Sequence, residues 1–460
     1  MTMQRWLRLT DHRDVGTCSI LFAVVAGLVG GVLSLALRLP AGSIGLPAGL
    51  SAWPAGMLPW QRLALQHGPI MVFFSAVPAL TGGFGNWFVP LLVGAPNTAF
   101  PRLAALSFWL TVAGFVLTLV GLLGAVNPAW TLSLAVHLAA AATLLCGANL
   151  VTTILNQRRP DMSLGALPVF VWSQLIAGTL AVAALPMMAA ALVMTHGPGP
   201  DMLASPAAAR FLFYPGFCLM ILPGLGLVSQ IVATFCGGRL AGERIVVLAL
   251  AALAMSGFLL WANQLLNGGV PAPASLFPLA ALLSVLLPAL LIAGCWTLTL
   301  WRAGGVRRLV APGLFASGFI VVLVVGSLVA LLREAGGASL APLHDVLSLA
   351  SVFALFAGFY YWIGKMTGKP YPERLARLQF VSLLAGVALL FGGLGAESPI
   401  AAAGASLVGV SMLLFALIVV ITLRGARSVA ANPWGAGAMT LEWSVPSPVP
   451  AGTFAEAALA

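Results

Sequence analysis

Residues 63–92 read LALQHGPIMVFFSAVPALTGGFGNWFVPLL, and this stretch decides the fold class. It contains no Asp, Glu, Lys or Arg. A helix needs about 20 apolar residues to cross the hydrocarbon core of a bilayer, so this stretch is long enough to span it. Lipid offers no hydrogen-bond partner to exposed backbone groups, which favours a helix over an open strand. We therefore interpret residues 63–92 as a transmembrane helix.

The rest of the chain has the same character. Of its 460 residues 61% are hydrophobic and only 7% are charged, and the mean hydropathy is +1.06. Soluble domains carry roughly 25% charged residues, so the composition excludes a soluble enzyme, a disordered protein and a secreted disulfide scaffold. The five cysteines are scattered through apolar segments without a CxxC pair, so neither a disulfide framework nor a zinc site is expected.

Apolar stretches of similar length recur along the chain and predict an all-α, polytopic membrane protein with about twelve transmembrane helices. We place them at roughly 16–38, 63–92, 104–124, 132–156, 166–194, 209–236, 244–266, 273–301, 309–332, 341–364, 376–396 and 402–424. Residues 1–430 are expected to form this transmembrane domain. Residues 431–460 are expected to form a cytoplasmic tail that lies on the membrane face.

The basic residues indicate the orientation. With the N-terminus inside, 17 of the 21 Lys and Arg fall on the inner side and 4 on the outer side, as the positive-inside rule requires. The outer four are Arg38, Arg62, Arg210 and Arg333. We therefore attribute the net charge of +10 to basic residues that set the orientation in the membrane, and no nucleic-acid partner is expected.

Intramembrane ionisable groups are the first candidates for function because burying them is costly. His12 and His196 lie outside the predicted spans and are expected at the surface. His67 lies about four residues into the second span and His344 about three residues into the tenth, so at about 1.5 Å per residue both lie near one depth at the outer face.

Two neutral imidazoles at one level on different helices can hold a haem iron from both sides. The alternative is a pair of helix-end histidines bonded to backbone or headgroups. His137 lies about five residues into the fourth span, so depth alone does not exclude it as a ligand.

Several segments resemble subunit I of the haem-copper oxidases of the cytochrome c oxidase type, in order along nearly the whole chain. The stretch 66–96 resembles that family's second span, and Phe356–Lys365 resembles its tenth. The other matching segments are Thr10–Thr17, Leu167–Ser173, Ile221–Gly224, Ala431–Gly435 and Thr440–Trp443. The resemblance implies a twelve-helix bundle with a low-spin haem on His67 and His344. Arg38 matches a family arginine at that haem's ring substituent. The alternative is an ordinary interfacial arginine that snorkels.

The sequence departs from this family at the oxygen-reducing centre. Two residues before His344, where the family has the high-spin haem ligand, this chain has Pro342. The three copper-ligand positions hold Tyr214, Asn263 and Gln264, and the position of the family's cross-linked tyrosine holds Cys218. Copper prefers imidazole or thiolate ligands to amides, so neither copper nor a second haem is expected.

The proton routes that the resemblance implies have lost their titratable groups. Their three positions hold Asn97, Gly216 and, less securely aligned, Ile292. The arginine pair that the family places between spans 11 and 12 is absent, because that loop is shortened to about 395–400. Asp345 stands where the family usually has an aromatic residue, and its role is open.

Three hypotheses follow. The first is a membrane electron-transfer subunit with one bis-histidine low-spin haem, of type a or b, and no oxidase activity. The second is an active terminal oxidase that couples oxygen reduction to proton transport. The third is a haem-free structural or assembly subunit. A single haem at one depth implies a partner, such as a subunit II-like protein, a cytochrome c-like donor or a dehydrogenase. The Ala- and Arg-rich composition favours a bacterial inner membrane, with both termini cytoplasmic.

Overall fold

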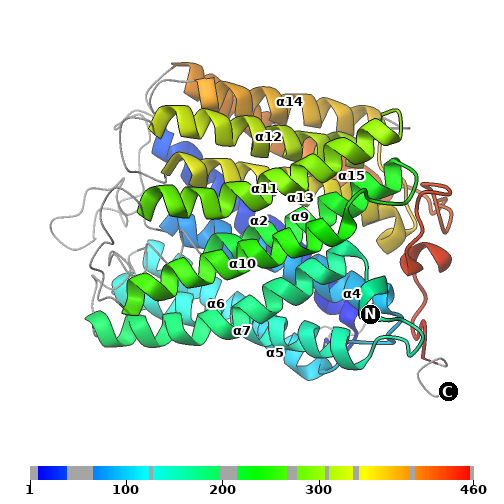
Figure 1. Cartoon of the computed structure of the whole chain (residues 1–460), viewed down its shortest axis with the longest axis horizontal. Coiled ribbons are helices and arrows are strands. Elements are labelled where there is room, and N and C mark those ends of the chain that lie inside the picture. The colour runs from blue at the N-terminus through cyan, green and yellow to red at the C-terminus, as the bar shows by residue number, and fades with distance from the viewer. Residues whose placement is uncertain are drawn as a thin grey trace.

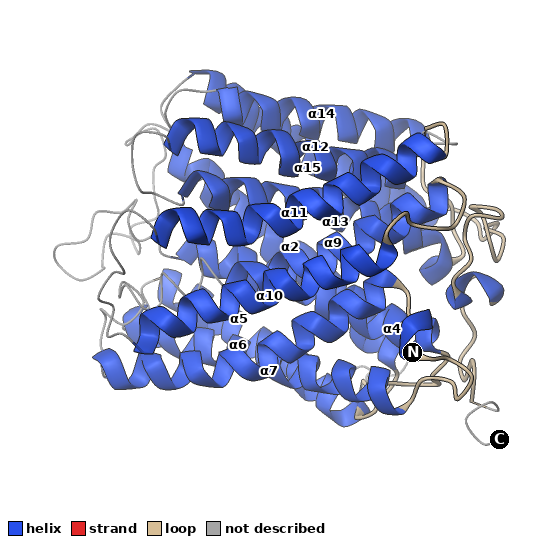
Figure 2. Cartoon of the chain, in the orientation of Figure 1, coloured by secondary structure: helices blue, strands red, loops and turns tan. Residues whose placement is uncertain are grey.

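The structure is a computed structural model. It describes residues 9–38, 66–123, 128–196, 215–266, 277–305, 310–334, 341–392 and 399–455. These residues form helices and connections, with no strand among them (Figure 2). The predicted all-α class is therefore confirmed.

The expected twelve spans are all present as helices. The second span comprises residues 66–93 and is called span 2 below; it contains η2 (Ile70–Ala76), η3 (Pro78–Gly85) and α4 (Asn86–Val93). The other spans are α2 (His12–Arg38), α5 (Pro101–Leu122), α6 (Pro128–Asn156), α7 (Val169–His196), α9 (Phe217–Phe235), α10 (Glu243–Leu266), α11 (Phe277–Arg302), α12 (Ala311–Glu334), α13 (Ala341–Thr367), α14 (Glu373–Gly392) and α15 (Pro399–Arg424).

Eleven of these helices are long and apolar enough to cross a membrane within their described residues, and α11 contributes a shorter described stretch, Leu286–Arg302. Figure 1 shows the helices side by side with their long axes roughly aligned. The first described residues, most of the described connections and the C-terminal segment 425–455 gather at one end of this bundle (Figure 1). We call residues 425–455 the tail and this end of the bundle the tail end.

Span 2 is wider than an ordinary helix over most of its length. Its residues 70–76 and 78–85 form π-turns, and the N–H of Val77 reaches the carbonyl of Val72, five residues back. Pro78 lacks an N–H and removes one bond of the α-helical ladder, which favours this local rearrangement. The Ser75 hydroxyl donates to the Ala23 carbonyl of α2 at 3.1 Å, so the two helices are joined midway.

Three helices occupy the centre of the bundle. In their most apolar windows 94% of α9, 83% of span 2 and 78% of α13 is buried, against 22% of α15 and 28% of α14 at the rim. At the tail end the rings of Phe88 and Trp362 stack with centroids 4.0 Å apart, which ties span 2 to α13. Any group held between span 2 and α13 is therefore shielded from lipid by the other helices.

Small residues allow the closest helix contacts, and α6 and α7 give the clearest test. A Cβ on Gly178 would lie 2.9 Å from the Gly147 carbonyl oxygen and 2.8 Å from Val151 Cγ2. We expect Gly178→Ala to force the two helices apart and to lower stability by about 1–3 kcal/mol. Gly409→Ala is the control, because a Cβ there meets nothing within 4 Å. The measurement is thermal unfolding in detergent; equal midpoints for the two variants would contradict the packing.

Candidate functional site

His67 lies in the first turn of span 2, where its ring is held by the neighbouring helix. Its Nδ1 is 3.0 Å from the carbonyl oxygen of Gly30 on α2. A carbonyl oxygen can only accept, so Nδ1 carries the proton and donates it to this bond. The lone pair of the neutral imidazole therefore belongs to Nε2. Histidines that ligate a metal commonly donate their other ring N–H to a carbonyl in this way, which sets the ring orientation.

Glycines make this arrangement possible. A Cβ on Gly30 would overlap the Met71 side chain of span 2, so glycine at this position lets α2 approach span 2 without displacing that side chain. Directly after His67, a Cβ on Gly68 would meet nothing within 4 Å among the described residues. The His67 tautomer is therefore set by a carbonyl that the close approach of α2 brings within reach.

His344, the second predicted ligand, lies in the first turn of α13. The described part of this site includes its backbone but not its side chain. Pro342 precedes it, at the second residue of the helix, where a missing N–H costs nothing. Asp345 follows and is exposed. Helix α13 packs against both η2 and η3, so the two predicted ligands stand on neighbouring helices. Arg38 is the last residue of α2, and its side chain also lies outside the described residues.

His137 shows the same tautomer. Its Nδ1 is 2.8 Å from the Ser133 carbonyl of its own helix, and its Nε2 is buried without a partner among the described residues. The tautomer therefore does not separate the two candidates. They differ in the source of the bond, since the carbonyl that holds His67 comes from another helix and the one that holds His137 lies one turn back in α6.

The former oxygen centre is described only in part. Cys218 is buried on α9, and its thiol points to the Leu253 carbonyl of α10 at 3.5 Å. Gly216 precedes α9, and Ile292 is fully buried on α11. Tyr214 and the side chains of Asn263, Gln264 and Pro342 lie outside the described residues, so closure of this region by apolar packing stays a prediction.

Asn97 has a well-defined structural role at the tail end. Its Nδ2 donates to the Thr10 carbonyl at 2.8 Å, and its Oδ1 accepts from the backbone N–H of His12 at 3.2 Å and of Thr98 at 2.8 Å. The side-chain amide thus joins the start of α2 to the connection between span 2 and α5. An aspartate could accept the two N–H groups but could not donate to Thr10.

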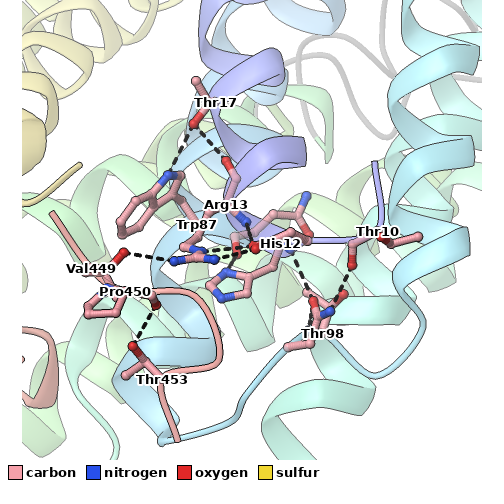
Figure 3. Close-up of polar contacts among 12 residues, drawn as sticks. Thr10, His12, Arg13, Thr17, Trp87, Thr98, Val449, Pro450 and Thr453 are labelled. Atoms are coloured by element: carbon pink, nitrogen blue, oxygen red, sulfur yellow. Dashed lines mark hydrogen bonds and ion pairs between the residues drawn. The ribbon is translucent and has the colours of Figure 1, made fainter. Parts of the chain in front are cut away.

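His12, which we expected at the surface, is buried, and that expectation is wrong. It is 4% exposed, and its Nδ1 donates to the Asn86 carbonyl of α4 at 3.0 Å. Beside it, the Arg13 guanidinium donates to both carboxylate oxygens of Asp11. It also donates to the Val449 carbonyl of the tail at 2.9 Å (Figure 3). Burial alone would raise the pKa of Asp11, but the hydrogen bonds from Arg13 outweigh it and bring the pKa to about 2. The segment around His12 therefore connects the start of α2 to α4 and to the tail.

Fold and site together define a multi-pass helical membrane protein with a histidine on its central span 2, held by the neighbouring α2. Residues 14–398 match the sequence model of the family described as Cytochrome C and Quinol oxidase polypeptide I. The chain is also 31% identical to "Cytochrome c oxidase subunit 1" of Cereibacter sphaeroides, over 98% of this chain and 94% of that protein. It belongs to the cytochrome c and quinol oxidase polypeptide I family, whose members are membrane subunits of respiratory electron transport.

The hydrogen bonds of the Asn97 side chain lead to a prediction about stability. We expect Asn97→Asp to lower the unfolding free energy by about 1 kcal/mol at neutral pH, because a carboxylate would face the Thr10 carbonyl without a proton between them. Asn156→Asp is the control, since it adds the same charge at an exposed position on the same end of the bundle. Thermal unfolding in detergent near pH 7 measures both. A variant at position 97 that is as stable as the control would show that the Asn97 amide is not needed.

Proposed function

We propose that this chain is an electron-transfer subunit that holds one low-spin haem between His67 and His344 near the outer face and does not reduce oxygen. The observation that carries the proposal is the bond from His67 Nδ1 to the Gly30 carbonyl. It gives the ring the tautomer that a ligand at Nε2 needs, on a helix that packs against α13, which carries His344.

Each residue has a part in this proposal. The Gly30 carbonyl sets the tautomer in which Nε2 of His67 would be the ligand atom, and His344 would supply the second imidazole. Arg38 would contact the ring substituent. When bound, such a haem would supply reversible one-electron chemistry. Asp345, next to His344, would favour the ferric state if its carboxylate faces the iron.

The loss of oxygen chemistry rests on residue identities. Proline at position 342 has no ligand atom for a second haem, and the amides of Asn263 and Gln264 are poor copper ligands. The three proton-route positions hold Asn97, Gly216 and Ile292, none of which titrates near neutral pH. The hydrogen bonds of Asn97 support a structural role at its position in place of proton uptake.

The proposal includes a setting for the protein. One haem at one depth cannot carry electrons across a bilayer, so the chain works beside other membrane subunits of a respiratory or dehydrogenase complex. A subunit II-like or cytochrome c-like protein is the proposed redox partner. We place the chain in a bacterial plasma membrane with its basic tail end in the cytoplasm, as the 17 basic residues on that side indicate.

Substitution of the ligands tests the haem. We expect His67→Ala and His344→Ala each to abolish the low-spin absorbance while the protein stays folded in the membrane. His137→Ala is the matched control and should keep the full spectrum, because its ring is held within its own helix. The measurement is a reduced-minus-oxidised optical spectrum with a haem extract of the purified chain. Loss of the spectrum in the control and its survival in either variant would transfer the assignment to His137.

Oxygen consumption tests the absent centre. With a chemical reductant, the purified chain should show reversible reduction but no sustained oxygen uptake, and cyanide should leave its spectra unchanged because both axial positions are occupied. One haem and no copper per chain agree with the proposal. Two haems with copper and cyanide-sensitive oxygen uptake would identify an active oxidase, and absence of haem would identify a structural subunit. Contaminating oxidases are excluded by the same assay on membranes that lack the chain.

A further inference from the structure

The tail is docked deeply into the tail end of the bundle. Lys365 of α13 is fully buried and donates from Nζ to the carbonyls of Ala431 at 2.6 Å and Val445 at 2.7 Å. The tail's one helical turn, η6 (Leu441–Ser444), packs on α4. A Cβ on Gly437 would overlap the Thr234 carbonyl of α9, so tail and bundle are in direct backbone contact.

Glu442 is the acidic residue that this docking buries. It is fully buried, and its Oε1 accepts from Nε2 of Gln230 on α9 at 3.1 Å. Three buried polar atoms around this pair lack a partner at hydrogen-bonding distance, namely Oε2 of Glu442, Oε1 of Gln230 and Nε1 of Trp362. The Trp362 indole lies near the Glu442 carboxyl, as do the Thr440 hydroxyl and the backbone N–H of Glu442. Unpartnered buried polar atoms are rare in native proteins, so three around one carboxyl require an explanation.

The nearby donors are already in use. Thr234 donates its hydroxyl proton to the Gln230 backbone carbonyl at 3.0 Å, so the 2.8 Å contact between Thr234 and Tyr361 uses the Tyr361 proton. The Trp443 indole donates to Tyr361 at 3.1 Å. Lys365 uses two protons on tail carbonyls and lies 5.2 Å from the centre of the Trp443 ring. The Gln230 side chain also lies beside Tyr361, but the one hydroxyl proton of Tyr361 is used on Thr234, so no donor among these groups remains for Oε1 of Gln230.

One additional proton, carried by Glu442, would give these buried polar atoms their missing hydrogen-bond partners. An ionised carboxylate can take Trp362, Thr440 and its own backbone N–H as donors, but it leaves Gln230 Oε1 without one. A neutral carboxylic acid adds an O–H donor, so that Oε2 can accept from Trp362 and donate to Gln230. If the Gln230 amide is reversed, two oxygens lie 3.1 Å apart, and the same proton is needed between them. We propose that Glu442 is protonated in the docked tail, and that this proton latches the tail onto α9 and α13.

The charges around the carboxyl agree with this assignment. Burial is the largest influence on Glu442 and raises its pKa to about 7, against smaller opposing effects from Thr440, Trp362 and Lys365. The titratable groups beside it are Lys365 and Tyr361 from α13. Helix α4 carries no titratable side chain, and α9 carries no charged one. Lys365 is therefore the one cation beside the carboxyl, and Glu442 is the acid that the tail contributes.

The sign of the pH dependence follows from linkage. Docked Glu442 binds its proton more tightly than an exposed glutamate, whose pKa is 4.5, so docking is strongest at acid pH and weakens as the pH rises towards 7. Between about pH 6 and about pH 8 the opening equilibrium should rise about tenfold for a carboxyl with these two pKa values. Within the proposed cytoplasmic setting, the tail would loosen as the cytoplasm becomes alkaline.

Infrared spectroscopy on the wild-type protein tests the proton directly. We expect a protonated carboxylic acid band near pH 6 that shifts with isotope-labelled glutamate and is missing in Glu442→Gln. Its intensity should fall as the pH is raised through 7. If Glu442 gives only carboxylate bands near pH 6, as it would if a trapped water supplied the missing donor, the proposal is overturned.

Hydrogen exchange of the tail tests the latch. After correction for the intrinsic rate, backbone exchange in residues 428–445 of the wild type should be about tenfold faster near pH 8 than near pH 6. Glu442→Gln mimics the neutral acid and should keep slow exchange at both pH values. Glu373→Gln is the control, because Glu373 caps Ala311 and binds Arg377 at the same end of the bundle, and it should keep the wild-type dependence. A wild-type tail whose protection does not change with pH would contradict the proposal.

Discussion

The structure depends on one constraint, that backbone polar groups inside a bilayer must find partners within the protein. Helices meet this constraint alone, and most of the chain is built from them. Span 2 departs from the α-helical ladder in the middle of the bundle, and it does so where α9 and α13 shield it from lipid. The central position of this helix is therefore a condition for its irregular backbone.

Polar side chains follow the same constraint. Buried serines and threonines donate hydrogen bonds from their hydroxyls to backbone carbonyls of the preceding turn, as in Ser229, Thr143 and Ser351. The longer side chains join elements that are distant in sequence, as Asn97, Lys365 and Glu442 do at the tail end. That end is a connected polar layer in which the first and last described segments of the chain meet, through the bond from Arg13 to Val449.

Hydrophobic length predicted the helices well because it is a local property of the sequence. The second span was expected at 63–92 and is described from 66 to 93, and the tenth was expected at 341–364 and is found at 341–367. The π-turns of span 2 were not predicted, since periodicity alone does not distinguish them from an α-helix with prolines. The expectation for His12 failed because its polar neighbours Asp11 and Arg13 resemble a solvated helix start, whereas contacts from residues 86 and 97 bury it. The hydrogen bond between His67 and Gly30 could not be predicted either, because the two residues lie 37 positions apart in the sequence.

The widened backbone of span 2 has a consequence for how it lies along α2. Four residues of an α-helix exceed one turn by about 40°, so side chains spaced by four drift around its surface. In span 2, His67, Met71 and Ser75, spaced by four, all meet α2, and Gly83 and Trp87 continue the same line. The π-turns contain more residues per turn, which offsets this rotation. The side chains that meet α2 therefore stay on one straight line along the helix. The number of residues between Trp87 and His67 therefore sets the direction of the imidazole, and adding or removing one residue anywhere between them would turn the ring away from Gly30.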